Sequence, residues 1–431
     1  DGDAPDQGAV DLDARGGTRP RVPRPGIAHR PPGALTGRAE SAPFVRDGSR
    51  LRCDDGRMDA DVVVVGAGVV GLACAAELSR AGLSVVVAER HAAPGQETSS
   101  RNSQVLHAGI YYAPGSLKTR LCLAGNRSLA AFCEAHGVPF RRIGKWLLAL
   151  TPGEEPRLAE VVAGGRANGV ALEEVPIARF REEEPHARAT AAVLSPTTGI
   201  LDVHGLLRAL RVLAEENGTS FAFRHALKAA SPVPGGFELV FEDPAGEEVR
   251  LTAPRVVNAA GLDADTVAAM PGLDVDAAGY RQTWTKGSYF RVRSARRHLA
   301  RRLLYPVLPA GYGSLLGIHL TVDLDGELKF GPDIEVFAGR RQDYAVDEGR
   351  RDSFLAAARR YLPSLEPEDL APDQSGIRPR LQAIGAPFRD FVIAEESARG
   401  LPGWVNLVGI ESPGLTSCLE IAREVTTLLS A

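Results

Sequence analysis

Long apolar runs, paired cysteines and an excess of either charge are all missing from this sequence of 431 residues. No apolar run reaches the length of about 20 residues that a helix needs to span a bilayer. Any contact with a membrane is therefore expected to be peripheral, at its inner face. The five cysteines are scattered, without a C-x-x-C pair. They favour reduced thiols in the cytoplasm and predict neither a disulfide framework nor a metal site. The net charge of -4 argues against a nucleic-acid binder that works by bulk electrostatics.

Residues 1–57 lack hydrophobic periodicity and are rich in proline, glycine and arginine, and the first methionine is Met58. This composition predicts a disordered tail, which an over-extended gene start would also explain. A targeting peptide is the weaker alternative, because it would need an amphipathic or apolar core that this segment lacks.

The most informative stretch runs from Asp61 to Glu89. It combines an apolar run, glycines in the spacing G-x-G-x-x-G (Gly66, Gly68 and Gly71), a small-residue helix and a second apolar run that ends on Glu89. The glycines permit a tight turn, a close approach to a pyrophosphate and close packing of helix on strand, while the acid suits a ribose hydroxyl. The pattern predicts dinucleotide binding. The alternative is a βαβ unit whose glycines only make the turn.

A polar cluster follows in the segment TSSRNSQVLHAGIYY, residues 98–112. Its hydroxyl and amide groups, with His107 behind them, are typical of a phosphate or flavin cradle beside a nucleotide-binding turn. A polar surface loop held by local side-chain bonds is the alternative. The cluster comprises Ser99, Ser100, Asn102 and Ser103.

Further along the chain, hydrophobic periodicity predicts helices over 118–136, 154–168, 202–217 and 352–361, the third of them capped by Asp202. Strands are expected over 141–150, 221–251, 279–292 and 303–337, and RVVNAAG (255–261) reads as a second buried strand. Near the end, a strand leads through a turn with Gly409 and Gly414 into a helix from about Leu415. The start of that helix is expected to face a ligand that carries partial negative charge.

The motifs GAGVVG, SSRNSQVLHAGIYYAPGSLK, VVNAAG, LYP with GIHLT, GIRPRL and VGIESPGLTSCLEIA span most of the chain after residue 57. In these motifs the chain resembles the FAD-dependent oxidoreductases of the D-amino-acid oxidase type, and within them the L-2-hydroxyglutarate dehydrogenases and oxidases. It departs from their pattern in TKGSYF, where Lys286 stands in place of an expected arginine–glycine pair.

The resemblance implies an α/β fold with a Rossmann-like FAD-binding domain built from the segments 58–140, 196–270 and 373–431. A mixed or antiparallel β-sheet substrate domain, 141–195 and 271–372, would be inserted between them. The residues implied for FAD binding are Gly66, Gly68 and Gly71 at the pyrophosphate, Glu89 and Arg90 at the adenosine ribose, Ser99, Ser100 and Asn102 near the flavin, Gly261 at the adenine side, and Gly409, Gly414, Leu415 and Thr416 at the pyrimidine end.

The resemblance also implies that Arg378, in GIRPRL, grips the substrate carboxylate. Oxidation of a 2-hydroxy acid requires hydride transfer from the α-carbon to flavin N5 and removal of the hydroxyl proton. A planar guanidinium can aim the α-hydrogen, and a base with a pKa near neutrality can take the proton. His107 is the first candidate for this base and His319 the second. The alternatives are a structural imidazole for His107 and a buried ion pair for Arg378.

A second carboxylate would bind Lys286, Tyr289 or Arg380, which could equally have solvated or core roles. The implied function is FAD-dependent oxidation of a small 2-hydroxy acid, with L-2-hydroxyglutarate as the best match. The alternatives are oxidation of an amino acid or secondary amine on the same scaffold, and a flavin- or nucleotide-binding protein without turnover. The sequence does not choose among oxygen, a quinone and a carrier as the electron acceptor.

Overall fold

The computed structural model of the protein describes residues 58–308, 317–336, 339–383 and 385–430. All of them belong to the second of two units into which the chain divides, residues 47–431. The predicted disordered tail lies outside the described residues, as do residues 309–316 and 337 of the predicted strand-rich segments.

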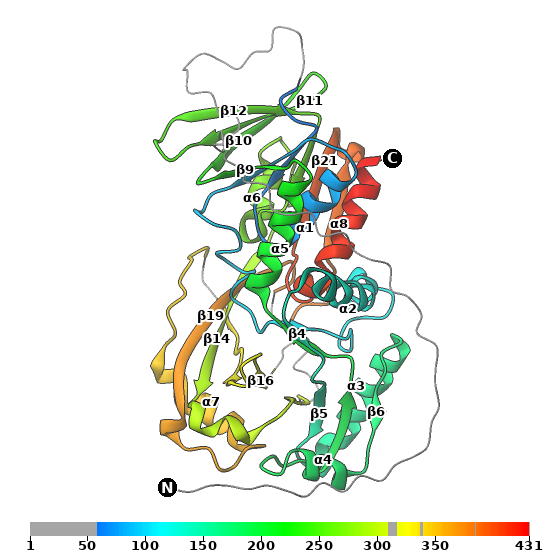
Figure 1. The fold of residues 1–431 in the computed structure, drawn as a ribbon, viewed down its shortest axis with the longest axis vertical. Coiled ribbons are helices and arrows are strands. Elements are labelled where there is room, and N and C mark those ends of the chain that lie inside the picture. Colours follow the sequence, from blue (N-terminus) through cyan, green and yellow to red (C-terminus); the bar gives the residue numbers. More distant parts are fainter. Residues whose placement is uncertain (1–57, 309–316, 337–338, 384, 431) are drawn as a thin grey trace, which may run out of the picture. The chain divides into compact units, whose positions relative to one another are not determined.

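The glycine-rich turn belongs to a six-stranded sheet with the strand order β20–β21–β13–β1–β2–β9. Figure 1 labels β9 and β21 of this sheet. Neighbouring strands are parallel, except β20, which runs antiparallel to β21. In β1, Val62 and Val64 pack into the core on one face of the sheet, and Val63 and Val65 into the core on the other. Burial on both faces explains why this strand is continuously apolar. The strands are β1 (Val62–Val65), β2 (Val85–Glu89), β9 (Ser220–Phe223), β13 (Arg255–Asn258), β20 (Val392–Glu396) and β21 (Leu401–Val408).

Helices cover one face of this sheet. Helix α1 contacts both α5 and α8, and α2 packs on α8. The buried small residues of α1, among them Ala73, Ala75 and Ala76, permit this close contact. The other face carries α6 and the antiparallel sheet β10–β11–β12. The bounds are α1 (Val69–Arg80), α2 (Leu117–His136), α5 (Val203–Glu216), α6 (Ala264–Ala269), α8 (Gly414–Ser430), β10 (Ala226–Val233), β11 (Gly236–Glu242) and β12 (Glu248–Ala253).

A second, nine-stranded sheet follows the order β18–β14–β17–β16–β15–β5–β7–β6, with β19 paired to β14. It is mixed, because β15 and β5 are parallel while the other pairs are antiparallel. Helices α4 and α7 contribute Phe180 and Phe354 to a core with Trp146 and Phe290. The elements are β5 (Lys145–Ala149), β6 (Glu173–Glu174), β7 (Ala191–Ser195), β14 (Thr283–Val292), β15 (Leu303–Pro306), β16 (Leu320–Val322), β17 (Leu328–Phe330), β18 (Glu335–Val336), β19 (Leu370–Arg380), α3 (Glu155–Ala167), α4 (Ile177–Glu183) and α7 (Arg351–Arg359).

A small sheet, β3–β8–β4, lies between these parts of the chain. Its strands are β3 (Val105–Leu106), β4 (Phe140–Arg141) and β8 (Gly199–Leu201). Strand β3 contacts α8, which brings the histidine that follows it to the start of the last helix.

The fold is α/β, as predicted, and the predicted helices are present with bounds that differ by a few residues. Two local expectations are corrected. The strand expected over 141–150 is interrupted, because Gly144 has φ +75° between β4 and β5. Asp202 stands at the N-cap of α5, but its side chain makes no capping hydrogen bond. Residue 373, where the FAD-binding domain is expected to resume, lies in β19, which pairs with β14, and the division into domains stays a prediction.

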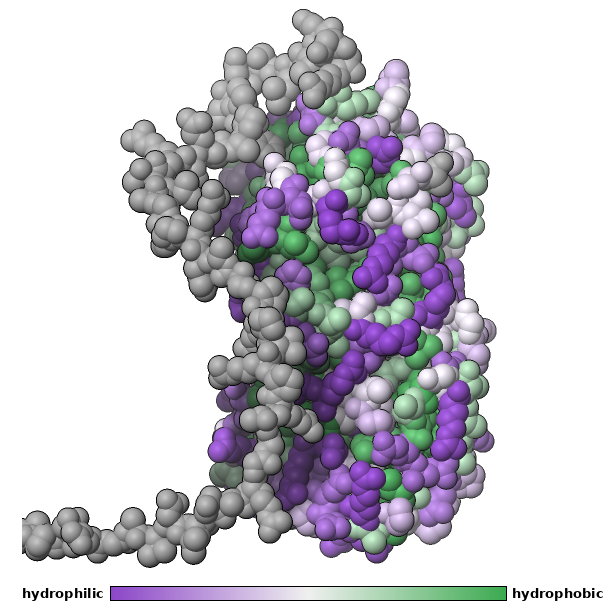
Figure 2. Space-filling view, turned by 45° about the vertical axis from the view of Figure 1, so that its right-hand side comes forward, coloured by the Kyte–Doolittle hydropathy of each residue, from purple (hydrophilic) through white to green (hydrophobic). Residues whose placement is uncertain are grey.

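Within the described ranges, no helix combines the length and apolar character that a membrane span requires. The same residues hold no cluster of histidine, cysteine and acidic side chains that could bind a metal ion. Cys74, Cys122, Cys133 and Cys418 are free and buried. The face in Figure 2 intersperses hydrophilic side chains with smaller apolar areas.

The contact between α2 and α8 depends on Gly125. A Cβ atom at this position would lie 2.2 Å from the backbone oxygen of Thr416. We expect Gly125→Ala to push the helices apart and to cost about 1–3 kcal/mol of the free energy of unfolding. Gly164→Ala, in α3, is the control, because no atom lies within 4 Å of the added methyl group there. Thermal unfolding of both variants is the measurement, and an unchanged midpoint for Gly125→Ala would show that the helices do not meet so closely.

Candidate active site

The turn between β1 and α1 is built by glycines. Gly66 has φ +101°, which few other residues adopt, and a Cβ atom on Gly71 would lie 2.0 Å from the oxygen of Gly66. The first turn of α1 carries no acidic residue, and Ser99 Oγ accepts a hydrogen bond of 2.9 Å from the N–H of Val69. The helix therefore presents its positive end without a negative side chain of its own.

Two clefts open at this turn, and a third adjoins one of them. The Glu89 cleft and the Arg378 cleft share the turn and the segments near Ser99 and Gly261, and their empty volumes are about 1080 Å³ and 1200 Å³. The third, the Lys118 cleft, shares His107, Arg378 and other residues with the Arg378 cleft. The clefts thus form one path from the end of β2, past the helix start, to the second sheet.

Glu89 ends β2 inside the first cleft. Its two carboxylate oxygens accept hydrogen bonds of 2.8 Å from the N–H groups of Ala67 and His91. Both bonds hold the carboxylate beside the glycine turn, and each oxygen keeps a lone pair for a ligand.

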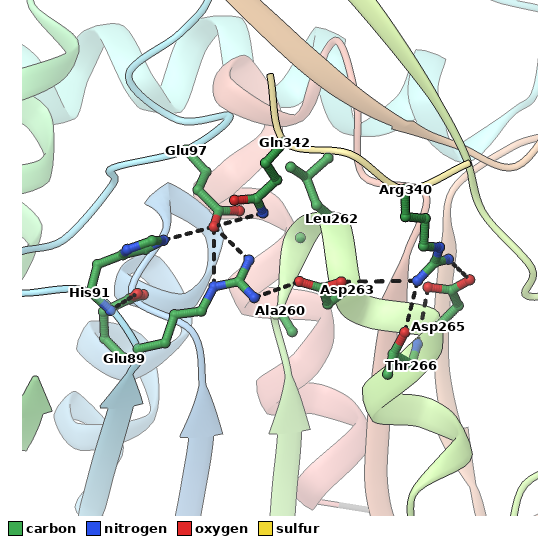
Figure 3. Close-up of polar contacts among 12 residues, drawn as sticks. Glu89, His91, Glu97, Ala260, Leu262, Asp263, Asp265, Thr266, Arg340 and Gln342 are labelled. Carbon is green, nitrogen blue, oxygen red and sulfur yellow. Dashed lines mark hydrogen bonds and ion pairs between the residues drawn. The ribbon is translucent and has the colours of Figure 1, made fainter. Parts of the chain in front are cut away.

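The wall of the Glu89 cleft is held by ion pairs (Figure 3). Arg90 lies between Glu97 and Asp263, at 2.5 Å and 2.6 Å. Arg340, from the connection between β18 and α7, pairs with Asp265, whose side chain is fully buried. Close by, Gln342 Nε2 donates to Glu97 over 3.2 Å. These contacts tie Gln342 to the loop after β2 and Arg340 to α6, so residues 340–342 hold the wall of this cleft.

Arg378 lies on β19 opposite Thr285 and lines both the Arg378 cleft and the Lys118 cleft. Among the described residues, no carboxylate forms an ion pair with its guanidinium, and none accepts a hydrogen bond from it. The alternative role considered for this residue, a structural ion pair, thus finds no partner in the part of the chain that is described. The arrangement leaves the guanidinium available to an anion in the cleft.

His107 follows β3 and is held by its backbone. Thr416 Oγ1 accepts its N–H at 2.9 Å, and Asn126 Nδ2 donates to its carbonyl oxygen at 2.8 Å. The ring reaches the clefts, where Nε2 lies 3.3 Å from Ser412 Oγ. His319 stacks on the ring of Tyr305, with 3.8 Å between the ring centroids.

Both imidazoles are neutral at physiological pH. Burial, together with the positive charges of Lys145 and Arg378, lowers the pKa of His107 and of His319 to about 3. A neutral imidazole can accept a proton, but a pKa of about 3 makes it a weak base. A bound anion would counter the two cations and raise the pKa.

Other predicted residues divide into those that line a cleft and those that support one. Gly68, Ser99, Asn102, Gly261, Gly414 and Leu415 line the Arg378 cleft, and Gly66, Glu89 and Arg90 line the Glu89 cleft. None of the three clefts is lined by Gly71, Ser100, Gly409, Thr416 or Lys286. Thr416 instead holds His107, and Gly409 donates its N–H to Gln282 Oε1 at 2.8 Å. Ser100 Oγ donates to the oxygen of Glu97.

The three residues expected at a second carboxylate are separated. Lys286 neighbours Thr285 on β14, and because adjacent side chains of a strand point to opposite faces, it leaves the sheet away from Arg378. Its Nζ lies 3.9 Å from Asp343. Tyr289 lines the Arg378 cleft and bonds Ser103 Oγ over 2.9 Å. Arg380 lines the Lys118 cleft.

Sequence reasoning did not find Lys145, Tyr305, Glu411 and Ser412. Glu411 lines two clefts and accepts a hydrogen bond of 3.2 Å from Lys118. Lys145 is 1% exposed and begins the otherwise apolar strand KWLLA. That a charged residue opens a fully buried strand was the one available signal, because lysine is rarely buried without a specific reason.

FAD fits this arrangement. The positive end of α1 lies where the Glu89 and Arg378 clefts meet, which suits a pyrophosphate. Glu89 suits the ribose on one side, and the more apolar Arg378 cleft has room for a flavin ring on the other. Residues that would hold the cofactor thus come from both ends of the described chain.

Comparison with known proteins agrees with this fit. The family model described as FAD dependent oxidoreductase (DAO) matches residues 61–428. The chain is 36% identical to the mitochondrial L-2-hydroxyglutarate dehydrogenase of Arabidopsis thaliana, over 85% of this chain and 82% of that one. It is 27% identical to the L-2-hydroxyglutarate dehydrogenase of Escherichia coli (strain K12), over 86% and 94%. The solved structure of L-α-glycerophosphate oxidase from Mycoplasma pneumoniae with FAD bound matches with a TM-score of 0.77 and 25% identity, covering 86% of this chain and 95% of that one.

The position of Glu89 gives a test of the cofactor site. Glu89→Gln replaces one acceptor oxygen by an amide donor and removes the charge. Loss of a charge-assisted hydrogen bond of about 1.5–3 kcal/mol should weaken FAD binding roughly 10- to 100-fold. Fluorescence titration of the apoprotein with FAD measures this, with Glu77→Gln as a control on the exposed pair with Arg80. Equal affinity in Glu89→Gln and the unmodified protein would place the ribose elsewhere.

Proposed function

The chain belongs to the family of FAD-dependent oxidoreductases and has FAD as its cofactor, and we propose that it oxidises L-2-hydroxyglutarate, a small 2-hydroxy acid, to the 2-oxo acid. The observation that carries the proposal is the guanidinium of Arg378 in the cleft, with no carboxylate partner among the described residues. The names of the Arabidopsis and Escherichia relatives support the substrate.

Arg378 binds the carboxylate next to the hydroxyl group. A carboxylate that enters a narrow cleft loses hydration, and a charged, planar donor offsets this loss by two parallel hydrogen bonds. The rigid strand pair β14–β19 fixes the backbone of Arg378, which orients the bound acid. When bound, FAD would supply the acceptor for the hydride that leaves the α-carbon of the substrate.

His107 takes the hydroxyl proton. Its neutral ring has an acceptor nitrogen available, and its backbone is held at both N–H and C=O. Because the carboxylate on Arg378 neutralises one of the cations that depress its pKa, the substrate itself strengthens the base. His319 is the second candidate, but it is stacked on Tyr305.

The second carboxylate lies in the Lys118 cleft, which continues from Arg378. Among the described residues, Lys118, Arg157 and Arg380 line this cleft together with one acidic side chain, Glu411. The excess of positive charge favours an anionic group there.

The cytoplasm remains our proposal for the compartment, on the basis of the free, buried cysteines. The Arabidopsis relative is named as a mitochondrial protein. Oxygen, a quinone and a protein carrier remain open as the electron acceptor.

Anaerobic mixing of the holoenzyme with hydroxy acids and amino acids tests the function. L-2-hydroxyglutarate should bleach the flavin and yield 2-oxoglutarate without ammonia. Bleaching by an amino acid or secondary amine instead, with an amine or ammonia product, would favour the alternative activity. A flavin that no member of the panel reduces would identify a binding protein without turnover.

Arg378→Met keeps much of the stem volume but removes the charge. We expect kcat/KM for L-2-hydroxyglutarate to fall by roughly two to four decades, because truncating one partner of a desolvated ion pair costs about 3–5 kcal/mol. Arg378→Lys should recover only part of this loss, since a point charge cannot hold the carboxylate plane.

The matched control is Arg293→Met, which removes a guanidinium that is 57% exposed at the end of β14 and pairs with Asp369. Flavin spectra confirm that each variant retains FAD. Near-normal KM and turnover in Arg378→Met would show that the carboxylate binds elsewhere.

A further inference from the structure

Lys145 is a buried cation behind the substrate clefts. Its Nζ lies 4.6 Å from the ring centroid of Tyr305 and 4.9 Å from that of Tyr111. Both tyrosines line the Lys118 cleft, so the ammonium group is separated from the cleft by their rings. In strand β5, Lys145 points to the same face as Leu147, which packs with Tyr305 and Ile110 between the second sheet and the segment around His107.

No carboxylate among the described residues forms an ion pair with Lys145, and its polar contacts there are the two aromatic rings. A lone cation at 1% exposure is costly, because burial removes its hydration. Aromatic faces offset part of this cost but do not neutralise the charge. The burial of Lys145 therefore points to a role other than stabilising the fold.

The ionisable groups around Lys145 come from several elements. They are Tyr111 after β3, Tyr305 on β15, Cys122 on α2, His107, His319 and Arg378. Burial raises the pKa of Tyr305 and of Cys122, the latter to about 12. With the histidines neutral, Lys145 is the member of this group that titrates near neutrality, since burial lowers its pKa to about 7.

We propose that Lys145 is a positioning residue that couples anion binding to proton uptake: its ammonium charge, acting across Tyr111 and Tyr305, balances the negative charge that a dicarboxylate brings into the clefts. This inference rests on the proposed function. Without ligand, the lysine loses its proton as the pH rises past neutrality. When the dianion is bound, the lysine holds the proton, so the anion and a proton enter together.

The sign of the pH dependence follows. A bound anion raises the pKa of Lys145, so binding is favoured when the lysine is protonated. Affinity should be constant below about pH 7 and should fall by up to about tenfold for each pH unit above it, until the lysine also loses its proton in the complex.

Calorimetric titration of the holoenzyme with glutarate tests the inference without turnover. Measured at pH 7.5 in two buffers of different ionisation enthalpy, binding should take up roughly 0.7 proton per glutarate, which follows from the pKa of about 7 in the free protein. Zero uptake by the unmodified holoenzyme would overturn the inference.

Two variants distinguish the effect of the positive charge of Lys145 from the effect of its titration. Lys145→Arg keeps a permanent charge, so glutarate should bind without proton uptake and with affinity that no longer falls between pH 7 and 9. Lys145→Met should bind glutarate at least tenfold more weakly at pH 6.5 and take up no proton. If Lys145→Met does not fold, Lys145→Arg alone decides, because full uptake in that variant would assign the proton to another group.

The matched control is Lys329→Met in the same sheet, since Lys329 is 16% exposed and pairs with Asp373. Its proton uptake should equal that of the unmodified protein. Normal flavin reduction by L-2-hydroxyglutarate without proton uptake on glutarate binding would defeat only this inference. Absence of both flavin reduction and glutarate binding would defeat the proposed function and the inference with it.

Discussion

A guanidinium in a narrow cleft needs an anion, and the described part of this chain does not provide one for Arg378. The positive charge of Arg378 also lowers the pKa of ionisable groups near it. Burial keeps His107 and His319 neutral and lowers the pKa of Lys145, and the positive charges of Lys145 and Arg378 lower the pKa of the two histidines as well. A carboxylate substrate counters these charges, since it supplies the missing negative charge and makes the histidine a better base.

Each of the two large sheets supplies a different part of this site. The six-stranded sheet supplies the glycine turn, the free helix start of α1 and the carboxylate of Glu89, which suit a dinucleotide. The nine-stranded sheet supplies Arg378 on β19 and Lys145 on β5. The ion pairs of Arg340 connect the segment after β18 to residues beside the Glu89 cleft (Figure 3).

The sequence predicted those features that depend on residues close together in the chain. The valine run, the glycine spacing and the terminal acid identify the βαβ unit because each residue has its role within about 30 positions of chain. Roles that depend on contacts between distant parts of the chain were harder to predict from the sequence. The β14–β19 register pairs Arg378 with Thr285, which places the neighbouring Lys286 on the opposite face of the sheet, and no single strand reveals this. Thr416 was expected to face the flavin, yet its hydroxyl holds the backbone of His107, 309 positions away. In the sequence, Lys145 was visible only as a charged residue in an apolar strand. The two tyrosines whose rings its ammonium group contacts come from separate segments of the chain.

The central claim is that the positive cleft at Arg378 receives a dicarboxylate beside the cofactor. A crystal structure of the holoenzyme with glutarate tests it most directly. The account predicts one carboxylate bound to the guanidinium of Arg378 and the other in the Lys118 cleft, with Tyr111 and Tyr305 between that carboxylate and Lys145. Glutarate bound away from Arg378, or a guanidinium of Arg378 turned to a protein carboxylate in the complex, would contradict it.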